Sequence, residues 1–390
     1  MIEDGALLGR RKVPSVEGRH KLLFVLPSLG GGGAERATVD LIRGMDRDRF
    51  DVSVALFDQR GAFLQQLPGD VAVHNLRGGD RYDVRLVFRL AALVRSEQPD
   101  IVFSVLRYAN LVTLLARRMA CSKAKVIVNE QSLPSAEFGL FGGARTKGWF
   151  LRRLYPQADL VTAISQGIVR ELTAVYDLPE SKVRVIHNPV DVARVRTMGD
   201  MTLEHPWYQS GLPVLVSAGR LNREKGFAHL IRAFAVVCRT VECRLIILGE
   251  GPERRELERL VSELELGEAV TLPGFQDNPY SYMRGATVFV LSSLYEGFGN
   301  VIVEALALGV PVVSTRCPVG PEEIISDGVT GLLVPPGDEQ VLVGALVRIL
   351  TDNQLRSELS ANGPGRAEDF AVDHIVAQYE SVFERLAGGA

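Results

Sequence analysis

The sequence predicts an α/β fold in which two Rossmann-like domains face each other across a cleft. Short runs of Val, Ile and Leu alternate with amphipathic helical stretches, which is typical of parallel sheets covered on both faces. The pattern restarts after a stretch rich in Gly, Pro and polar residues, from about Asn188 to Pro213. The length of 390 residues also exceeds what one ordinary hydrophobic core holds.

The first half of the chain follows an N-terminal extension, residues 1–20, which lacks the apolar core of a signal peptide and is expected to be disordered. We assign residues 21–195 to an N-terminal Rossmann-like domain. Its buried apolar runs predict strands at 21–27, 51–57, 100–104, 125–129, 159–163 and 183–186, and its amphipathic stretches predict helices at 34–45, 83–96 and 108–119.

The second half repeats this alternation, and we assign residues 196–369 to a second Rossmann-like domain. Strands are expected at 214–218, 244–248, 270–272, 287–291 and 311–314, with helices at 226–239, 253–264 and 300–308. Residues 370–390 are expected to form a C-terminal helix that crosses back to the first domain. Because ligands of such folds bind beyond the carboxyl ends of the strands, the cleft is the expected site.

Composition excludes several classes of function. The formal net charge of −3 gives no reason to expect a nucleic acid partner. The four cysteines are dispersed without a CxxC pair, so neither a disulfide framework nor a zinc site is expected. Since no stretch reaches the roughly 18 apolar residues of a membrane helix, we expect a cytoplasmic protein whose membrane contact, at the inner face of the cell membrane, is peripheral.

The most informative segment is residues 295–305, YEGFGNVIVEA, which follows an apolar strand. A helix that begins near Asn300 presents free backbone N–H groups and a partial positive charge, and both favour a diphosphate. Glu296 precedes this helix, and Glu304 is expected about one turn inside it, facing the same mouth. Their carboxylates can accept hydrogen bonds from the vicinal hydroxyls of a ribose or hexose. The alternative is that Glu304 is a solvent-facing helix residue.

A second segment, residues 217–226 (SAGRLNREKG), also lies between a strand and a helix. Arg220 and Lys225 are expected to project into the same mouth. A diphosphate leaving group needs its charge neutralised while its bond to a sugar breaks, and two cations supply that neutralisation. The alternative is a solvated loop whose charges serve solubility.

Glycines 30–33 open the first helix, ahead of Ala34 and Glu35, and allow a phosphate or sugar to approach the backbone closely. The cluster is not a GxGxxG motif with an acidic residue downstream, so dinucleotide binding is poorly supported. A flexible turn is the alternative. The Asp-Arg-Asp sequence at 46–48 is interpreted as a surface turn, and no metal site is expected.

The ordered set GRLNREKG, GEGPER, LPGF, YEGFGNVIVEA, STRCPVGPEEI and DGVTGLLVPPGD resembles glycosyltransferase family 4. The resemblance covers about residues 21–386 and is strongest over 217–337. It implies a retaining glycosyltransferase of the GT-B fold that uses no metal ion and no other cofactor. It also implies that the first domain binds the acceptor and the second binds the nucleotide sugar.

The resemblance also implies individual roles. Glu304 would hold the nucleotide ribose, Glu296 would contact the donor sugar, and Arg220 and Lys225 would neutralise the diphosphate. Further donor-binding positions are Gly274 and Phe275 near the base, Gly297, Phe298, Gly299, Asn300 and Val301 near the sugar and phosphates, and Gly32 and Gly33 across the cleft.

One departure concerns the acceptor side. Many family members carry a histidine after the fourth strand of the first domain, whereas this chain has SVLRYAN at 104–110. Arg107, Asn110 or Glu130 is therefore the candidate for the vacant role. The other histidines, including His187 at the domain junction, are interpreted as structural.

Substrates are indicated by the segment 314–324, which together with GGGGAER resembles bacterial enzymes that extend lipid-linked glycans from UDP-sugars. The resemblance therefore implies transfer of a hexose or N-acetylhexosamine in the synthesis of cell-surface polysaccharides or glycoconjugates. Two other functions are weighed: a nucleotide-sugar-binding protein without turnover, and a nicotinamide-dependent oxidoreductase suggested by the glycines of residues 249–251.

The segment 145–155, RTKGWFLRRLY, mixes cations with large apolar side chains. Such a face can lie on an anionic bilayer. The alternative is an ordinary helix in which Trp149, Phe150 and Leu154 pack inward while the arginines face solvent.

Overall fold

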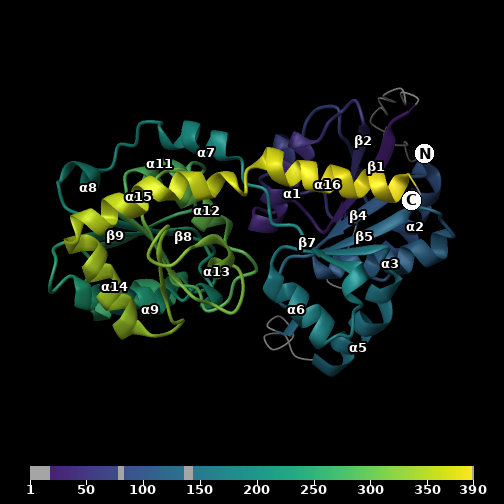
Figure 1. Ribbon diagram of the computed structural model, residues 1–390. Coiled ribbons are helices and arrows are strands. Elements are labelled where there is room, and N and C mark those ends of the chain that lie inside the picture. The colour runs from purple at the N-terminus through teal and green to yellow at the C-terminus, as the bar shows by residue number, and fades with distance from the viewer. Residues whose placement is uncertain (1–17, 78–82, 136–143, 389–390) are drawn as a thin grey trace, which may run out of the picture.

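Two parallel β-sheets, one in each half of the chain, form the framework of the molecule (Figure 1). The computed structural model describes residues 18–77, 83–135 and 144–388. Each sheet is covered by helices on both of its faces, and the two lobes stand side by side. The predicted fold of two Rossmann-like α/β domains is therefore confirmed.

The N-terminal lobe holds a seven-stranded sheet of order β3-β2-β1-β4-β5-β6-β7 in which every neighbouring pair is parallel. Its strands are β1 (His20–Leu26), β2 (Phe50–Leu56), β3 (Ala72–Asn75), β4 (Ile101–Val105), β5 (Lys125–Glu130), β6 (Leu160–Ala163) and β7 (Val183–Val185). Its helices and short 3₁₀ turns are α1 (Gly33–Gly44), η1 (Leu64–Gln66), α2 (Arg85–Glu97), α3 (Arg107–Ala120), α5 (Ala144–Leu154), η2 (Tyr155–Gln157), α6 (Gln166–Ala174) and η3 (Glu180–Lys182).

The C-terminal lobe holds a six-stranded parallel sheet of order β10-β9-β8-β11-β12-β13. Its strands are β8 (Val214–Ala218), β9 (Arg244–Leu248), β10 (Val270–Gly274), β11 (Val288–Leu291), β12 (Val312–Thr315) and β13 (Leu332–Val334). The helical elements of this half are α7 (Val192–Gly199), α8 (Pro206–Gln209), η4 (Arg223–Lys225), α9 (Phe227–Val237), α10 (Arg254–Glu263), α11 (Pro279–Arg284), α12 (Asn300–Ala307), α13 (Pro321–Ile324), α14 (Glu339–Thr351), α15 (Asn353–Glu368) and α16 (Val372–Ala387).

Strand periodicity divides the core between the two faces of each sheet. Along β1, Leu23 and Val25 pack in the cluster that holds α2 and α3, whereas Phe24 packs in the cluster that holds α1 and α16. Successive side chains of a strand point to opposite faces, so a strand that is apolar throughout is buried on both.

The chain crosses between the lobes twice, at adjacent places. Val190 forms a parallel bridge with Ala371, and its N–H donates to the carbonyl of Phe370 at 2.9 Å. After the second crossing α16 packs on α1 of the N-terminal lobe, where Gly44 leaves room for Val372 and Val376. In Figure 1 this helix, in yellow, lies along the N-terminal lobe, whereas α15 lies on the other lobe.

The structure differs from the sequence interpretation in several elements. Strands β3 and β13 are short and were not predicted, and the expected linker, residues 188–213, contains α7 and α8. Helix α7 packs on α11 and α12, so part of this segment belongs to the C-terminal lobe. Strand β1 begins at His20, inside the expected extension, whose residues 1–17 lie outside the described part of the chain.

Candidate active site

The two signature segments of the C-terminal lobe meet at the carboxyl ends of β8 and β11. Leu294 N–H donates to the carbonyl of Glu224 at 2.7 Å, and Ser292 Oγ donates to the carbonyl of Lys225 at 2.8 Å. Gly226 has φ of 62°, and a Cβ there would lie 2.2 Å from the Ser292 carbonyl oxygen. Glycine is therefore needed at this position to join the loops.

Within this junction Lys225 forms an ion pair with Glu296. Lys225 Nζ donates to Glu296 Oε1 at 2.5 Å, and Ser293 Oγ donates to the same oxygen at 2.7 Å. The Lys225 and Glu296 side chains are 21% and 9% exposed. The sequence analysis expected both residues at the same opening of the cleft. It predicted neither their direct contact nor the hydrogen bond that Ser293 donates to Glu296.

Helix α12 begins at Asn300, four residues after Glu296, at this junction of the two loops. Gly299 precedes it with φ of 103°, a conformation that favours glycine, and among the described residues no side chain caps the helix. Its first N–H groups thus keep the partial positive charge of a helix N-terminus. Phe298 is buried, with its ring tilted against that of His187 and edge-to-face with that of Phe370, so only its backbone faces the site.

The N-terminal lobe meets α12 through the glycine loop before α1. Asn300 Nδ2 donates to the carbonyl of Gly33 at 3.2 Å, and Asn300 Oδ1 accepts from Asn188 Nδ2 at 3.3 Å. A Cβ at Gly32 would lie 2.4 Å from a carboxylate oxygen of Glu35. The N-termini of α1 and α12 therefore approach each other across the cleft.

Arg220 is exposed at this cleft and faces Glu35 on the other lobe. Burial raises the pKa of Glu35 above its usual value, while a hydrogen bond from its own backbone and the Arg220 guanidinium oppose that rise. In the described part of the chain, no hydrogen bond or ion pair engages the Arg220 side chain. Its charge is available to an anion in the cleft.

Glu304 occupies a different environment from Glu296. It is 7% exposed, accepts a hydrogen bond from Tyr280 Oη at 3.3 Å, and lines a cavity of about 10 Å³ together with Arg36 and Asp40 of α1. Burial raises the pKa of Glu304 to about 7, Arg36 opposes the rise, and Asp40 adds to it. Glu304 therefore points toward α1 of the N-terminal lobe.

The segments expected near a nucleotide base lie at the neighbouring strand ends. Gly274 ends β10 with φ of 87°, and Phe275 beside it is 59% exposed. A Cβ at Gly249 would lie 2.0 Å from the carbonyl oxygen of Gly219, so the turn at 249–251 packs on the loop that carries Arg220. An exposed aromatic ring therefore adjoins the cationic loop.

The three acceptor-side candidates are brought together, but they are buried. Arg107 Nη2 donates to Glu130 Oε2 at 2.7 Å, and Asn110 Nδ2 donates to the carbonyl of Asn129 at 2.9 Å and to Glu130 Oε1 at 3.3 Å. Their exposures are 6% for Arg107, 0% for Asn110 and 1% for Glu130. Because these buried polar groups form hydrogen bonds with one another, they are not exposed to contact an acceptor. The expectation of direct contact is corrected: the three residues support the surrounding loops.

This buried network supports the loop that touches Gly297. Arg107 Nη2 also donates to the carbonyl of Ser132, at 3.1 Å. A Cβ at Gly297 would lie 2.0 Å from the carbonyl oxygen of Gln131. The end of β5 therefore packs directly on the residue that follows Glu296.

Comparison with known proteins supplies the family. The model of the family described as "Glycosyl transferases group 1" matches residues 208–366, and the model of "Glycosyltransferase Family 4" matches residues 31–194. An N-acetylgalactosamine-N,N'-diacetylbacillosaminyl-diphospho-undecaprenol 4-alpha-N-acetylgalactosaminyltransferase of Campylobacter jejuni is 31% identical over 364 residues, covering 90% of this chain and 96% of that protein. The chain belongs to glycosyltransferase family 4.

Two further proteins resemble this family 4 glycosyltransferase over nearly its full length. A second Campylobacter jejuni protein, the GalNAc-alpha-(1->4)-GalNAc-alpha-(1->3)-diNAcBac-PP-undecaprenol alpha-1,4-N-acetyl-D-galactosaminyltransferase, is 26% identical, covering 92% of this chain and 97% of its own. The crystal structure of Anabaena HepE in complex with UDP and glucose superposes with a TM-score of 0.77 at 25% identity, covering 94% and 100% of the two chains.

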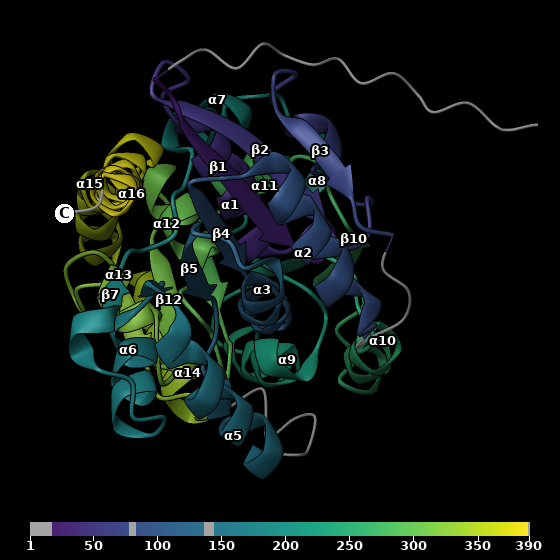
Figure 2. The same cartoon turned by 90° about the vertical axis from the view of Figure 1, so that its right-hand side faces the viewer.

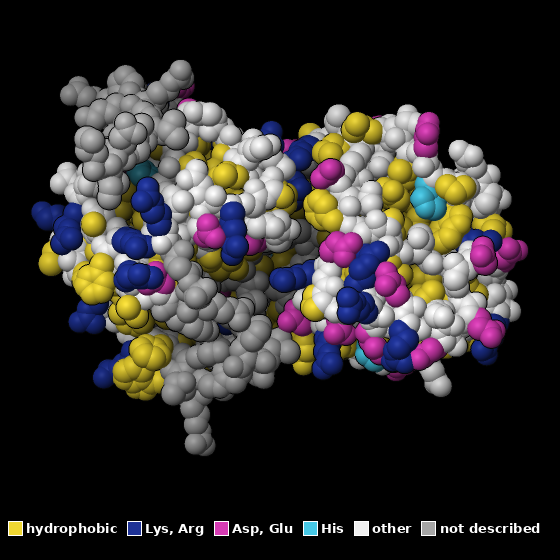
Figure 3. All heavy atoms as spheres, turned by 180° about the vertical axis from the view of Figure 1, so that it is seen from behind, with side chains coloured by type: hydrophobic (Ala, Val, Ile, Leu, Met, Phe, Trp, Pro, Cys, Tyr) yellow, Lys and Arg dark blue, Asp and Glu magenta, His cyan; other side chains and the backbone are white. Residues whose placement is uncertain are grey.

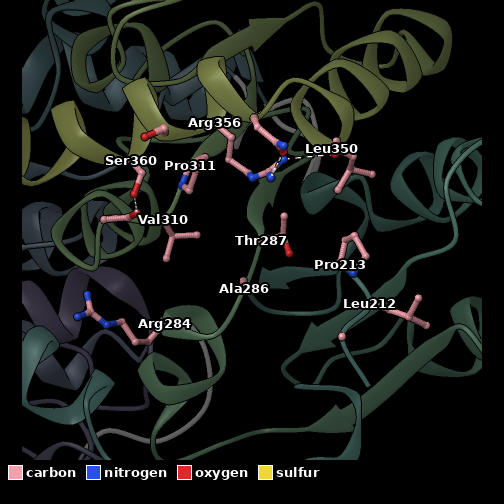
Figure 4. A pocket seen from close by; sticks show the side chains of 14 residues that line it. Leu212, Pro213, Arg284, Ala286, Thr287, Val310, Pro311, Leu350, Arg356 and Ser360 are labelled. Atoms are coloured by element: carbon pink, nitrogen blue, oxygen red, sulfur yellow. Dashed lines mark hydrogen bonds between the residues drawn. The ribbon is translucent and has the colours of Figure 1, made fainter. Parts of the chain in front are cut away.

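A cavity elsewhere in the C-terminal lobe of the glycosyltransferase does not coincide with the candidate active site. A cavity of about 590 Å³ lies at the opposite end of the C-terminal sheet, between the starts of β8, β11 and β12 (Figure 4). The arginine at its upper wall, Arg356, donates to the carbonyls of Ile349 and Leu350, and Ser360 Oγ donates to Gly309. These polar groups of the cavity are engaged in hydrogen bonds within the fold. By contrast, the exposed Arg220 lies at the carboxyl ends of the strands.

Two general features complete the description of the glycosyltransferase. In residues 18–77, 83–135 and 144–388, no group of three or more His, Cys, Asp or Glu side chains is arranged to hold a metal ion. None of the helices within these ranges combines the length and the apolar composition needed to cross a bilayer.

Proposed function

We propose that this glycosyltransferase moves a hexose or N-acetylhexosamine from a UDP-sugar to a hydroxyl of a lipid-linked glycan. In this proposal the anomeric configuration is retained and no metal ion takes part. The observation that carries it is the Lys225–Glu296 pair near the N-terminus of α12, with the exposed Arg220 on the same loop as Lys225. The UDP bound to HepE and the polyprenyl diphosphate acceptors in the names of the two Campylobacter relatives support the substrate classes.

The donor is held by charge and by hydroxyl contacts. Arg220, Lys225 and the free N–H groups of α12 neutralise the diphosphate, and they do so most strongly as its bond to the sugar breaks. Glu296, whose orientation is set by Lys225 and Ser293, accepts hydrogen bonds from the donor sugar. Glu304 accepts from the ribose hydroxyls, exchanging its bond from Tyr280 for them.

The transfer step needs no protein nucleophile in this proposal. The bond between C1 of the sugar and the phosphate oxygen breaks, and the acceptor oxygen bonds to C1 from the face that the phosphate vacates. The acceptor proton moves to the departing phosphate, which carries the bonding electron pair. Pairing with Lys225 suits Glu296 to orienting the sugar rather than to attacking C1 as the second carboxylate of a double displacement would.

Donor hydrolysis tests this proposal without knowledge of the acceptor. The purified chain is incubated with UDP-, GDP- and ADP-sugars, with and without EDTA, and the released sugar is followed by NMR. We expect slow hydrolysis of a UDP-hexose or UDP-N-acetylhexosamine that survives EDTA and first yields the α-anomer. Activity that EDTA removes and Mg²⁺ or Mn²⁺ restores would contradict metal independence, and a preference for GDP or ADP would contradict the donor.

We further propose that the N-terminal lobe contacts an anionic membrane peripherally. On α5, Trp149 is 55% exposed and Phe150 is 48% exposed beside Arg152 and Arg153, while Leu154 is buried. Inward packing of Trp149 and Phe150 is therefore wrong. The side chains of residues 144–147, which include two further cations, lie outside the described part of the chain.

The distribution of charge between the lobes also supports membrane contact by the N-terminal lobe. Residues 21–195 hold 24 Lys and Arg against 18 Asp and Glu, whereas residues 196–390 hold 16 against 26. On the face shown in Figure 3, basic side chains predominate over the N-terminal lobe at the left, and both signs mix over the other lobe. Such asymmetry attracts one lobe to anionic lipid headgroups.

A further inference from the structure

A second groove lies between the lobes, next to the donor site but separate from it. It has a volume of about 470 Å³, and its walls come from α6 and Leu133 on one side and from Tyr295, Pro318 and Val319 on the other. This volume lies within the range of about 300–1,000 Å³ that is typical of small-molecule sites. In Figure 2, α6 and α13 lie next to each other.

The two walls are held together by direct contacts across the lobes. Glu323 accepts hydrogen bonds from the N–H groups of Gln166 at 2.9 Å and Gly167 at 3.3 Å, and His187 Nε2 lies 3.2 Å from its carboxylate. A Cβ at Gly167 would lie 1.9 Å from Val319 Cγ1. The two walls of the groove are therefore fixed relative to each other, because separating them would break these hydrogen bonds and the contact of Gly167 with Val319.

The groove offers an aromatic ring and a cation that the fold does not use. Tyr295 is 45% exposed, although its neighbour Glu296 is turned inward to Lys225. In the described ranges, no hydrogen bond or ion pair engages the exposed Arg170 guanidinium. The adjacent Glu171, by contrast, is committed to Ser135, accepting from its N–H and its Oγ at 2.7 Å each.

We propose that this groove binds the terminal sugar of the acceptor, with the Tyr295 ring against the apolar face of the pyranose and Arg170 donating to its oxygens. The inference rests on the proposed function, because it presumes transfer to a glycan. Aromatic faces pack on apolar C–H surfaces, and the guanidinium offers five N–H donors to hydroxyl and carbonyl oxygens. Tyr295 directly precedes Glu296, so the groove adjoins the segment that the proposed function assigns to the donor sugar.

The test compares acceptor use with donor hydrolysis in single variants. Octyl α-N-acetylgalactosaminide serves as the acceptor probe, since the relative from Campylobacter jejuni is named for a glycan that ends in N-acetylgalactosamine. We expect Tyr295→Ala and Arg170→Ala each to raise the KM for the probe on the order of 10-fold, as truncated Tyr and Arg contacts commonly do. Tyr295→Phe keeps the ring and should restore most of the affinity.

The controls separate the two proposals. Arg118→Ala removes another exposed arginine, on α3 and outside the groove lining, and should leave the probe KM unchanged. Donor hydrolysis needs no acceptor, so a wild-type chain that hydrolyses no nucleotide sugar would contradict the proposed function itself. Saturation-transfer NMR measures probe binding to the wild type and the variants even where transfer is slow. Equal binding or KM in wild type and both alanine variants, or a parallel fall in donor hydrolysis, would overturn the groove assignment.

Discussion

Glu296 and Glu304 lie eight positions apart, yet their surroundings differ in a way that separates their roles. Glu296 is ionically paired, with Lys225 and Ser293 on one oxygen. Glu304 is buried against α1, and within the described residues its hydrogen-bond donor is Tyr280. These surroundings suit Glu296 to contact a sugar whose charge changes during the reaction, and they suit Glu304 to bind a neutral hydroxyl.

The kinetic consequence is a split between kcat and KM. We expect Glu296→Ala to lower kcat for donor hydrolysis and to spare UDP affinity, because Lys225 is still present to bind the phosphates. Glu304→Ala should mainly raise the donor KM, because ribose binding is the same in ground and transition states. A hydrogen bond to a charged group contributes about 1.5–3 kcal/mol, so each effect should be roughly 10- to 100-fold. The reverse pattern in steady-state kinetics would contradict this division.

Glu304 should also make stability depend on pH. Burial, opposed by Arg36 and reinforced by Asp40, raises its pKa from 4.5 to about 7. Because the folded state disfavours the ionised form, stability is lost as pH rises through that range. Glu304→Gln removes the ionisation, so we expect its Tm relative to wild type to increase from pH 5.5 to pH 8.

The matched control for that measurement is Glu358→Gln on the exposed face of α15, which should give a Tm difference that does not change with pH. Asp40, whose pKa burial raises to about 6, titrates in all three proteins. A flat Tm difference for Glu304→Gln would show that its carboxylate is not the group responsible.

Sequence reasoning at the residue scale succeeded where the backbone decides position. Lys225 and Glu296 meet because their loops follow neighbouring parallel strands, which the order of apolar runs reveals. It failed for Arg107 and Glu130, because the burial of a side chain depends on packing from distant segments. Their mutual ion pair joins a helix start to a strand end that the local pattern does not orient.

At the scale of elements, the contact between α13 and α6 links the lobes. Burial disfavours the Glu323 carboxylate, but bonds from His187, Gln166 and Gly167 outweigh it and lower its pKa. The carboxylate also complements the positive end of α6. A carboxyl group whose pKa is lowered in the folded structure contributes stability above its unfolded pKa, and this stability is lost as pH falls through the lowered value.

Removing that charge should loosen the start of α6 without unfolding it. We expect Glu323→Gln to speed hydrogen exchange of the Gln166 and Gly167 amides by roughly 10- to 100-fold near neutral pH, since bonds to charged acceptors contribute about 1.5–3 kcal/mol. Glu322→Gln is the control, because that neighbouring carboxylate pairs with Arg316 at the surface. Equal exchange in the two variants would show that Glu323 does not hold the lobes together.

Elements were predictable to the extent that they are long and periodic. The central strands of both sheets fall within two residues of the apolar runs, because burial on both faces leaves an unmistakable pattern. The edge strand β3 is short and only partly buried, so it carries no such run. Helix α7 lies in the segment interpreted as linker because it is only eight residues long and the segment shows little periodicity. Its place is decided by packing against α11 and α12.

For the whole molecule, the unequal charge of the lobes and the exposed face of α5 predict directional membrane binding. We expect the combined replacements Trp149→Ser, Phe150→Ser, Arg152→Gln and Arg153→Gln to reduce sedimentation with anionic liposomes while donor hydrolysis is unchanged. Wild-type binding should weaken as salt rises, because the attraction is screened.

The control carries a similar change on the other lobe. Val236→Ser with Arg239→Gln removes an exposed apolar residue and a cation from the end of α9 and should leave liposome binding unchanged. Equal binding by the α5 variant and the wild type would contradict a membrane role for this helix.

The return of α16 to the N-terminal lobe also has a consequence for biosynthesis. Phe383 lies against Phe24, Phe50 and Phe103, so the first lobe to be synthesised receives the last part of its core only after the second lobe has been translated. At about 5–20 residues per second, the intervening stretch takes on the order of 10–40 s to synthesise. Throughout that interval the nascent N-terminal lobe bears an uncovered aromatic surface, so its window for aggregation and for chaperone binding is set by the speed of the ribosome rather than by its own folding rate.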